Sequence, residues 1–445
     1  MDSLAGLDEI DWAALEHAYG PATDIPPLLR QLAAPGLTEE SAQGIFGTFY
    51  ANIYHQGSRY TSSVAAVPFL VAILDAPTTS NTVRGWLIRL LVDLAVADPV
   101  WLLPKNFSVE VELKRAAEMQ TPEYEAKIIA EDAKWLMDDD TDEERERMRK
   151  NSIKRNQGRV QGALAAVQAH EAVKEALPVL YRLLKDPEPQ LRALASYAVA
   201  WFSTQVDATS RELFALLENE PILETRATAL ISLGVLQAPQ SISEAAEERR
   251  RVTETTISQF LLHFFQTKEI HELVKFCCAT AIILSGFAQR EHVAEVVQVL
   301  AEPATLEKYV VRREDDNGLS DVFPFGGISV LAAKALSTVR GRTNPDVLIA
   351  FARIIVERSR TLNTMSMLST ISASLQIAFD GKPFTAETLP PFEQLSVPQQ
   401  TLVRAIAQLK QWNSGNLMME LRRWGLPTMK DDFRIYAQTE EQQQC

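Results

Sequence analysis

The chain has 445 residues, 46% of them hydrophobic, and a net charge of −14 with an isoelectric point near 5.1. This length predicts two or three globular domains or one extended repeat array, with ample apolar material for a core. The negative charge argues against general binding to DNA or RNA, because a phosphate-binding surface needs a positive field.

The sequence carries no sign of export or of a membrane anchor. The opening MDSLAGLDEIDW is acidic and lacks the basic and apolar regions of a signal peptide. The longest apolar runs are interrupted by Arg89 and Asp93, or by Lys275, and fall short of a membrane span. We therefore expect a cytoplasmic protein without a membrane partner.

Three cysteines are present, and no CxxC pair occurs. Cys277 and Cys278 lie in the apolar run LVKFCCATAIIL, which is typical of buried core residues in a reduced compartment. The six histidines are scattered, and the motifs HExxH, GxSxG and the nucleotide-binding glycine loops do not occur. We expect no metal site and no cofactor.

Taken in chain order, the apolar periodicity predicts a series of helical hairpins. The first hairpin covers residues 24–54, and the second covers 66–96, where Pro68 begins an apolar helix that ends near Asp75 and Pro77. Each hairpin leaves an apolar face exposed, which only stacking against a neighbouring hairpin can bury.

The clearest hairpin is LPVLYRLLKDPEPQLRALASYAVAWF, residues 177–202. Asp186 and Pro187 end its first helix, and Pro189 suits the first turn of its second helix. Residues 211–236 repeat the pattern, with Arg226 following Arg192 at the repeat period. A recurring arginine is typical of a structural ladder between repeats. Weaker pairs follow at 254–286, at 289–301 with 328–340, and at 345–379.

These hairpins share the pattern L-P-x-L-x-x-L-L-x-D-P…R…A, which resembles HEAT repeats, including the HEAT-like subclass named from the phycobilisome bilin lyases. The resemblance covers roughly 24–100 and 160–380, and the two ends of the chain also resemble a functionally uncharacterised group of HEAT-repeat proteins. It implies an all-α fold, a right-handed α-α superhelix of stacked helical hairpins. We expect N-terminal repeats, a charged helical insertion, central repeats and a C-terminal helical cap, over residues 1–103, 104–158, 159–385 and 386–445.

The insertion, residues 104–158, is dense in charge and predicts a loop and two helices. Thr141 and Glu144 form a capping-box pattern at the start of its last helix. A second irregular stretch, 310–329, places Phe323 and Phe325 in a polar loop. These rings either fold back onto the helices or contact a ligand.

The best candidate site is NIYHQGSRYTSS, residues 52–63, which joins two hairpins. His55 is the candidate acid or base, because an imidazole titrates near neutral pH. Arg59 suits a carboxylate or phosphate. The other binding candidates in this segment are Asn52, Gln56 and Tyr60. The structural alternative is that these residues cap helix ends and fix the turn, in which Gly57 provides backbone freedom.

Two further groups have both a structural and a functional interpretation. Arg89 and Asp93 lie one turn apart in an apolar helix, where they either pair within the wall of the groove or bind a ligand. In HAYGPATD, residues 17–24, His17 and Tyr19 are weaker site candidates. Asp24 is predicted to cap the helix that follows it.

Two functions remain open from the sequence. The first is a binding scaffold whose concave groove holds a protein, a peptide or a small organic ligand. The second follows from the HEAT-like resemblance, which includes catalysts: a non-metal, acid–base lyase, isomerase or cyclase acting on a small organic substrate, with His55 as the base.

Overall fold

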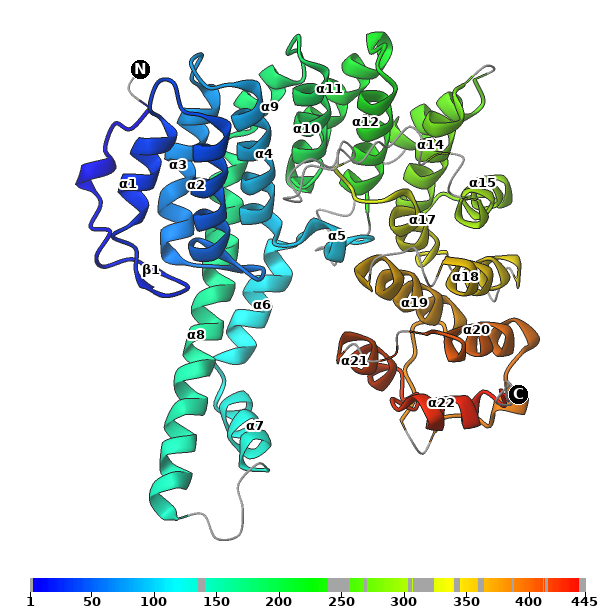
Figure 1. Cartoon of the computed structure of the whole chain (residues 1–445). Coiled ribbons are helices and arrows are strands. Elements are labelled where there is room, and N and C mark those ends of the chain that lie inside the picture. The colour runs from blue at the N-terminus through cyan, green and yellow to red at the C-terminus, as the bar shows by residue number, and fades with distance from the viewer. Residues whose placement is uncertain are drawn as a thin grey trace. The chain divides into compact units, whose positions relative to one another are not determined.

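The computed structural model describes most of the chain, namely residues 3–134, 141–238, 256–267, 270–302, 306, 324–339, 345–358, 364–385, 388–410, 412 and 415–439. These residues are mainly α-helical, which confirms the expected all-α class (Figure 1). The chain forms two compact units. The first holds residues 1–102, 106–218 and 240–250, and the second holds residues 103–105, 219–239 and 251–445.

The first unit begins with two short antiparallel hairpins among helices. The hairpins are β1 (Glu16–His17) with β2 (Gly20–Pro21), and β3 (Tyr54–His55) with β4 (Ser58–Arg59). Its helices are α1 (Ile25–Leu32), α2 (Glu39–Asn52), α3 (Thr61–Asp75), α4 (Asn81–Val96), α5 (Pro99–Leu102), α6 (Val109–Met119), α7 (Pro122–Ala133), α8 (Asp142–Lys174), α9 (Leu177–Leu183), α10 (Pro189–Val199) and α11 (Val206–Asn219).

Several helix ends follow the capping chemistry read from the sequence. Helix α10 begins at Pro189, as predicted. The hydroxyl of Thr141 accepts a hydrogen bond from the Glu144 amide, and the Glu144 carboxylate accepts one from the Thr141 amide at 2.8 Å, which confirms the capping box. Helix α3 begins at Thr61, earlier than Pro68 suggested, and the Tyr60 amide at its start donates to Ser63 Oγ at 2.7 Å.

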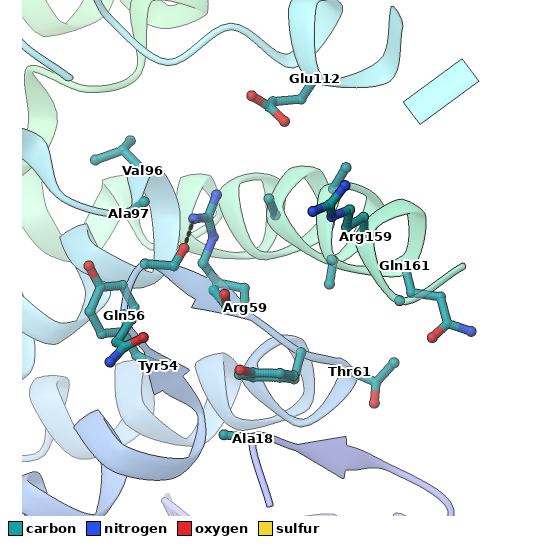
Figure 2. Close-up of a pocket in the computed structure, with 18 of the residues that line it drawn as sticks. Ala18, Tyr54, Gln56, Arg59, Thr61, Val96, Ala97, Glu112, Arg159 and Gln161 are labelled. Atoms are coloured by element: carbon teal, nitrogen blue, oxygen red, sulfur yellow. Dashed lines mark hydrogen bonds between the residues drawn. The ribbon is translucent and has the colours of Figure 1, made fainter. Parts of the chain in front are cut away.

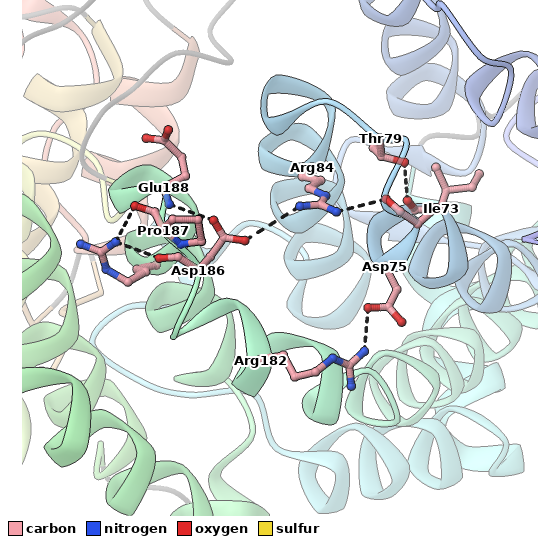
Figure 3. Close-up of polar contacts among 10 residues, drawn as sticks. Ile73, Asp75, Thr79, Arg84, Arg182, Asp186, Pro187 and Glu188 are labelled. Atoms are coloured by element: carbon pink, nitrogen blue, oxygen red, sulfur yellow. Dashed lines mark hydrogen bonds and ion pairs between the residues drawn. The ribbon is translucent and has the colours of Figure 1, made fainter. Parts of the chain in front are cut away.

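The α3–α4 and α9–α10 hairpins are linked by arginines other than the recurring pair Arg192 and Arg226 (Figure 3). Arg84 of α4 donates to the Ala76 carbonyl at 3.1 Å and lies 3.9 Å from the Asp186 carboxylate. Arg182 of α9 binds Asp75 at 2.6 Å. Arg192 donates to the Asp186 carbonyl at 2.8 Å, so it holds the turn of its own hairpin.

Helix α8 is 33 residues long and serves two parts of the first unit. It packs against α3, α4 and β4 and against α6 and α7, and Ser152 and Asn156 of its N-terminal half are hydrogen-bonded to α7 and α6. Figure 1 shows α6, α7 and this half of α8 extending as a helical arm from the layer of α1 to α4. The arm corresponds to the expected charged insertion, but the expected boundary at 158/159 falls inside α8.

The second unit consists of helices with many buried apolar residues. They are α12 (Leu223–Leu236), α14 (Glu272–Leu284), α15 (Arg290–Ala301), α17 (Ile328–Leu336), α18 (Pro345–Arg358), α19 (Thr364–Ala378), α20 (Val397–Ala407), α21 (Gly415–Arg423) and α22 (Lys430–Tyr436), together with helical residues 256–265. Helices α12 and α14 approach so closely that a Cβ on Gly234 would lie 2.6 Å from Ala281 Cα.

Apolar residues that the sequence placed in the core are buried in this unit. Cys277 and Cys278 are fully buried in α14. Phe325 is 1% exposed, which fits the expectation that it folds back onto the helices. Phe323 lies outside the described residues.

Candidate ligand-binding site

The first unit encloses a cavity of about 1250 Å³ (Figure 2). Its wall is built from the β3–β4 hairpin, the end of α4, the start of α6 and the middle of α8, with Glu16 to Ala18 of the first hairpin at its edge. Pockets that bind small molecules usually measure about 300–1,000 Å³, so this cavity is large enough for an organic ligand together with water.

The β3–β4 hairpin is shaped by its two turn residues. Gln56 has φ 50° and Gly57 has φ 83°, the left-handed conformations that a two-residue hairpin requires. The turn brings Tyr54 opposite Arg59 in the strand register. The sequence indicated the freedom of Gly57 but did not predict the hairpin.

Arg59 is the central charged group of the cavity. Arg59 is only 7% exposed, and its Nη1 donates to the Gly57 carbonyl at 2.5 Å. Its Nε has no hydrogen-bond partner, and among the described residues no carboxylate lies within 4.0 Å of the guanidinium. Burial lowers the pKa of Arg59, an effect that the nearby Tyr54 and Glu112 oppose.

The cavity wall carries more positive than negative side chains, although the chain as a whole is acidic. Four guanidinium groups face three carboxylates, namely those of Arg59, Arg115, Arg155 and Arg159 against Glu16, Asp98 and Glu112. Two of these arginines are engaged, since Arg115 lies 3.5 Å from Glu112 and Arg155 binds Asp132. Figure 2 shows Arg59, Arg159 and Glu112 around the same open space.

Helix α8 presents small residues to the cavity. Gly158 and Gly162 lie one turn apart on the lining face, and a Cβ on either would meet no atom within 4 Å. Their missing side chains therefore leave open space, whereas the missing side chain of Gly234 in α12 allows a close helix contact.

The structure brings three of the predicted site residues together and separates the others. Gln56, Arg59 and Tyr60 line the cavity. His55 is not among the described residues of the cavity wall, and its ring packs edge-to-face with Tyr19 at 5.5 Å.

Asn52 belongs to a hydrogen-bonded group outside the cavity proper. Its Nδ2 donates to Asp24 Oδ2 at 2.6 Å, and the other oxygen of Asp24 lies 3.0 Å from His17 Nε2. The Tyr19 amide donates to His17 Nδ1 at 3.0 Å, so both ring nitrogens of His17 are engaged. Asp24 does precede helix α1, but its carboxylate holds these side chains and makes no capping bond to the helix.

Arg89 and Asp93 belong to α4 and are not among the residues that line the cavity. The Tyr50 hydroxyl donates to Asp93 Oδ2 at 2.8 Å. Burial raises the pKa of Asp93 to about 7, while the Tyr50 hydrogen bond and the charge of Arg89 act in the opposite direction. Asp93 therefore has a hydrogen-bond partner within the protein in Tyr50.

His170 is a buried titratable residue that was not among the predicted site residues. Its ring stacks on Phe107 at 4.6 Å and lies 4.9 Å from the Phe202 ring. Burial lowers its pKa to about 4, so the ring is neutral at physiological pH.

The arginines of α6 and α8 were also missed as site residues, because their segment reads as a solvated charged helix. The sequence feature that could have indicated them is the pair Gly158 and Gly162 beside Arg159. Two glycines one turn apart destabilise a helix, so their presence suggests that the space beside the helix is needed for something else.

Comparison of the chain with family models, with curated proteins and with solved structures gives no match. Among the described residues, no helix has the length and apolar character needed to cross a membrane. The same residues include no group of three or more His, Cys, Asp or Glu side chains placed to hold a metal ion.

Proposed function

We propose that the protein is a HEAT-like solenoid binding protein, a right-handed superhelix of helical hairpins, which holds a small organic ligand in the cavity of its first unit. The observation that carries the proposal is Arg59, a buried arginine that faces this cavity and that finds, among the described residues, no partner for its Nε and no carboxylate within 4.0 Å.

A buried charge without a partner is unfavourable, and proteins normally compensate it with a counter-charge or with hydrogen bonds. Binding sites are a recurring exception, because the ligand supplies the missing partner. The surrounding residues support this explanation. Tyr54, Gln56 and Tyr60 add polar groups to the wall, and the glycines of α8 keep the opposite side open.

Binding accounts for these contacts better than acid–base catalysis does. His55, the predicted base, lies outside the cavity wall. His17 lies in the wall, but its Nε2 contacts Asp24 and its Nδ1 accepts from the Tyr19 amide. A general base needs a ring nitrogen within reach of the substrate, and these hydrogen bonds occupy both nitrogens of His17.

The proposal can be tested by filling the cavity from α8. A library of small organic metabolites is screened against the protein by native mass spectrometry, and the hits are titrated against Gly162→Leu and Gly47→Leu. Gly162 lines the cavity, whereas Gly47 is an exposed glycine of α2 with equal space around it. Gly162→Leu is expected to weaken binding at least tenfold, and Gly47→Leu is expected to bind like the wild type.

The proposal is wrong if no small molecule binds, or if every hit binds Gly162→Leu as tightly as the wild type. Circular dichroism of both variants serves as the folding control, since leucine is a better helix former than glycine at either position.

A further inference from the structure

We infer that the ligand is an organic anion whose phosphate or carboxylate group binds Arg59, with Arg159 as a second cation at the cavity wall. This inference rests on the proposed binding function and adds the chemical class of the ligand. It comes from the combination of a buried, incompletely bonded guanidinium, a second arginine that has no ion-pair partner among the described residues, and an open helix face.

The first step is the hydrogen-bonding capacity of Arg59. A guanidinium has several N–H donors in a planar fork and no acceptor, so only an acceptor can complete its bonding. In the part of the chain that the structure describes, Nη1 donates to the Gly57 carbonyl and Nε has no hydrogen-bond partner. The planar fork matches the two oxygens of a carboxylate or a phosphate, which is the arrangement that gives arginine its strongest hydrogen bonds.

The second step is the orientation of this guanidinium before any ligand binds. The Gly57 carbonyl that holds Nη1 belongs to the turn of the same hairpin, and the strand register places Tyr54 opposite Arg59. Helix α8 packs against β4, the strand that carries Arg59. A side chain held in this way loses little conformational freedom on binding, so more of the free energy of each new hydrogen bond contributes to affinity.

The third step is the charge around Arg59. The carboxylate of Glu112 is already paired with Arg115 at 3.5 Å. Arg159 lies exposed on the cavity side of α8, and among the described residues it has no carboxylate within ion-pair distance. A second uncompensated cation in the same cavity wall favours an anion over a neutral acceptor.

The fourth step is the size of the cavity. A lone phosphate would fill a small part of about 1250 Å³. The remaining wall includes Tyr54, Tyr60 and alanines of α8, which offer aromatic and apolar surface to a carbon skeleton. The geometry therefore points to an organic phosphate or an organic acid.

The test measures the binding of simple anions at low salt by isothermal titration calorimetry. The probes are pyrophosphate for the phosphate class and citrate for the carboxylate class, and the preferred probe identifies the class. Arg59→Gln and Arg159→Gln are compared with Arg182→Gln. Arg182 is a matched control, because it is an exposed arginine that pairs with Asp75 and does not line the cavity.

We expect saturable binding of at least one probe to the wild type, weakened about tenfold or more by Arg59→Gln, since a charge-assisted hydrogen bond is lost. Arg159→Gln is expected to weaken binding several-fold, and Arg182→Gln is expected to leave it unchanged. If Arg59→Gln fails to fold, Arg59→Lys and the exposed Arg159→Gln provide the comparison. Arg59→Lys keeps the charge but loses the fork, so it should bind more weakly than the wild type.

Two results would overturn the inference. The first is that neither anion binds while neutral library compounds bind in a Gly162-dependent manner, which leaves the proposed cavity function intact. The second is that an anion binds equally to the wild type, Arg59→Gln and Arg159→Gln, which places the anion elsewhere on the protein. If neither anions nor library compounds bind, the proposed function fails together with its ligand class.

Discussion

Replacing Gly158 and Gly162 by alanine should stabilise the protein, although both residues lie in the wall of the candidate binding cavity. In a helix interior, glycine is about 0.8–1.0 kcal/mol less favourable than alanine, because it loses more backbone freedom on folding. A Cβ at either position meets no atom within 4 Å, so no steric cost offsets this gain. The double variant should therefore gain about 2 kcal/mol.

For a unit of about 150–250 residues, each kcal/mol raises Tm by about 2–4 °C. The thermal transition of the first unit should therefore rise by about 4–8 °C, which calorimetry and circular dichroism at 222 nm can resolve. Gly47→Ala is the matched control, because Gly47 of α2 has equally open surroundings and no place in the cavity wall. It should gain about 1 kcal/mol alone.

An unchanged or lower Tm in the double variant, together with the expected gain for Gly47→Ala, would refute the reasoning. It would mean that some part of the protein contacts α8 at these glycines, and that the cavity is narrower than the structure describes.

The remaining predictions concern the second unit and the titration of buried groups. Gly234→Ala should lower stability by about 1–3 kcal/mol in chemical denaturation, because its Cβ would collide with the α14 backbone at Ala281; an unchanged midpoint would contradict this close contact. The pKa of His170 is lowered to about 4 in the folded protein, so as the pH drops from 6.5 to 4 this imidazole is protonated in the unfolded chain but not in the folded one. The free energy of unfolding should therefore fall by about 3 kcal/mol over this range. His170→Phe should therefore lose less stability than the wild type as the pH falls. The raised pKa of Asp93 makes the wild type lose stability as the pH rises from about 4 to about 7, so Asp93→Asn should lose less stability than the wild type over that range. Parallel pH profiles of stability for all three proteins would disprove both assignments.

The sequence predicted the helices well, because their signals are local. Pro189 at the start of α10, the Thr141–Glu144 capping box and the apolar stripes of the hairpins all depend on residues within a few turns of each other. Helix α8 was harder to predict as one element. Its charged N-terminal half and its apolar C-terminal half differ in composition, yet no residue between them stops the helix.

The candidate site was only partly predictable, because it depends on contacts between distant segments. The segment 52–63 was identified from its density of polar residues, and Arg59 in it does line the cavity. Which of its residues face the cavity is decided by the β3–β4 hairpin, whose two-residue strands are too short for a periodic signal. Arg159 joins Arg59 only because α8 folds back along the hairpin, a contact that no local pattern encodes.

The continuity of α8 gives the first unit a mechanical property. At a rise of about 1.5 Å per residue, its 33 residues form a rod about 50 Å long, which lines the cavity along its middle and contacts α7 at Ser152 and Arg155. A rod with an unbroken hydrogen-bond ladder transmits tilt along its whole length. A force applied where α7 packs would therefore displace Gly158, Arg159 and Gly162 together. A change of the bound ligand would in turn displace the N-terminal end of α8.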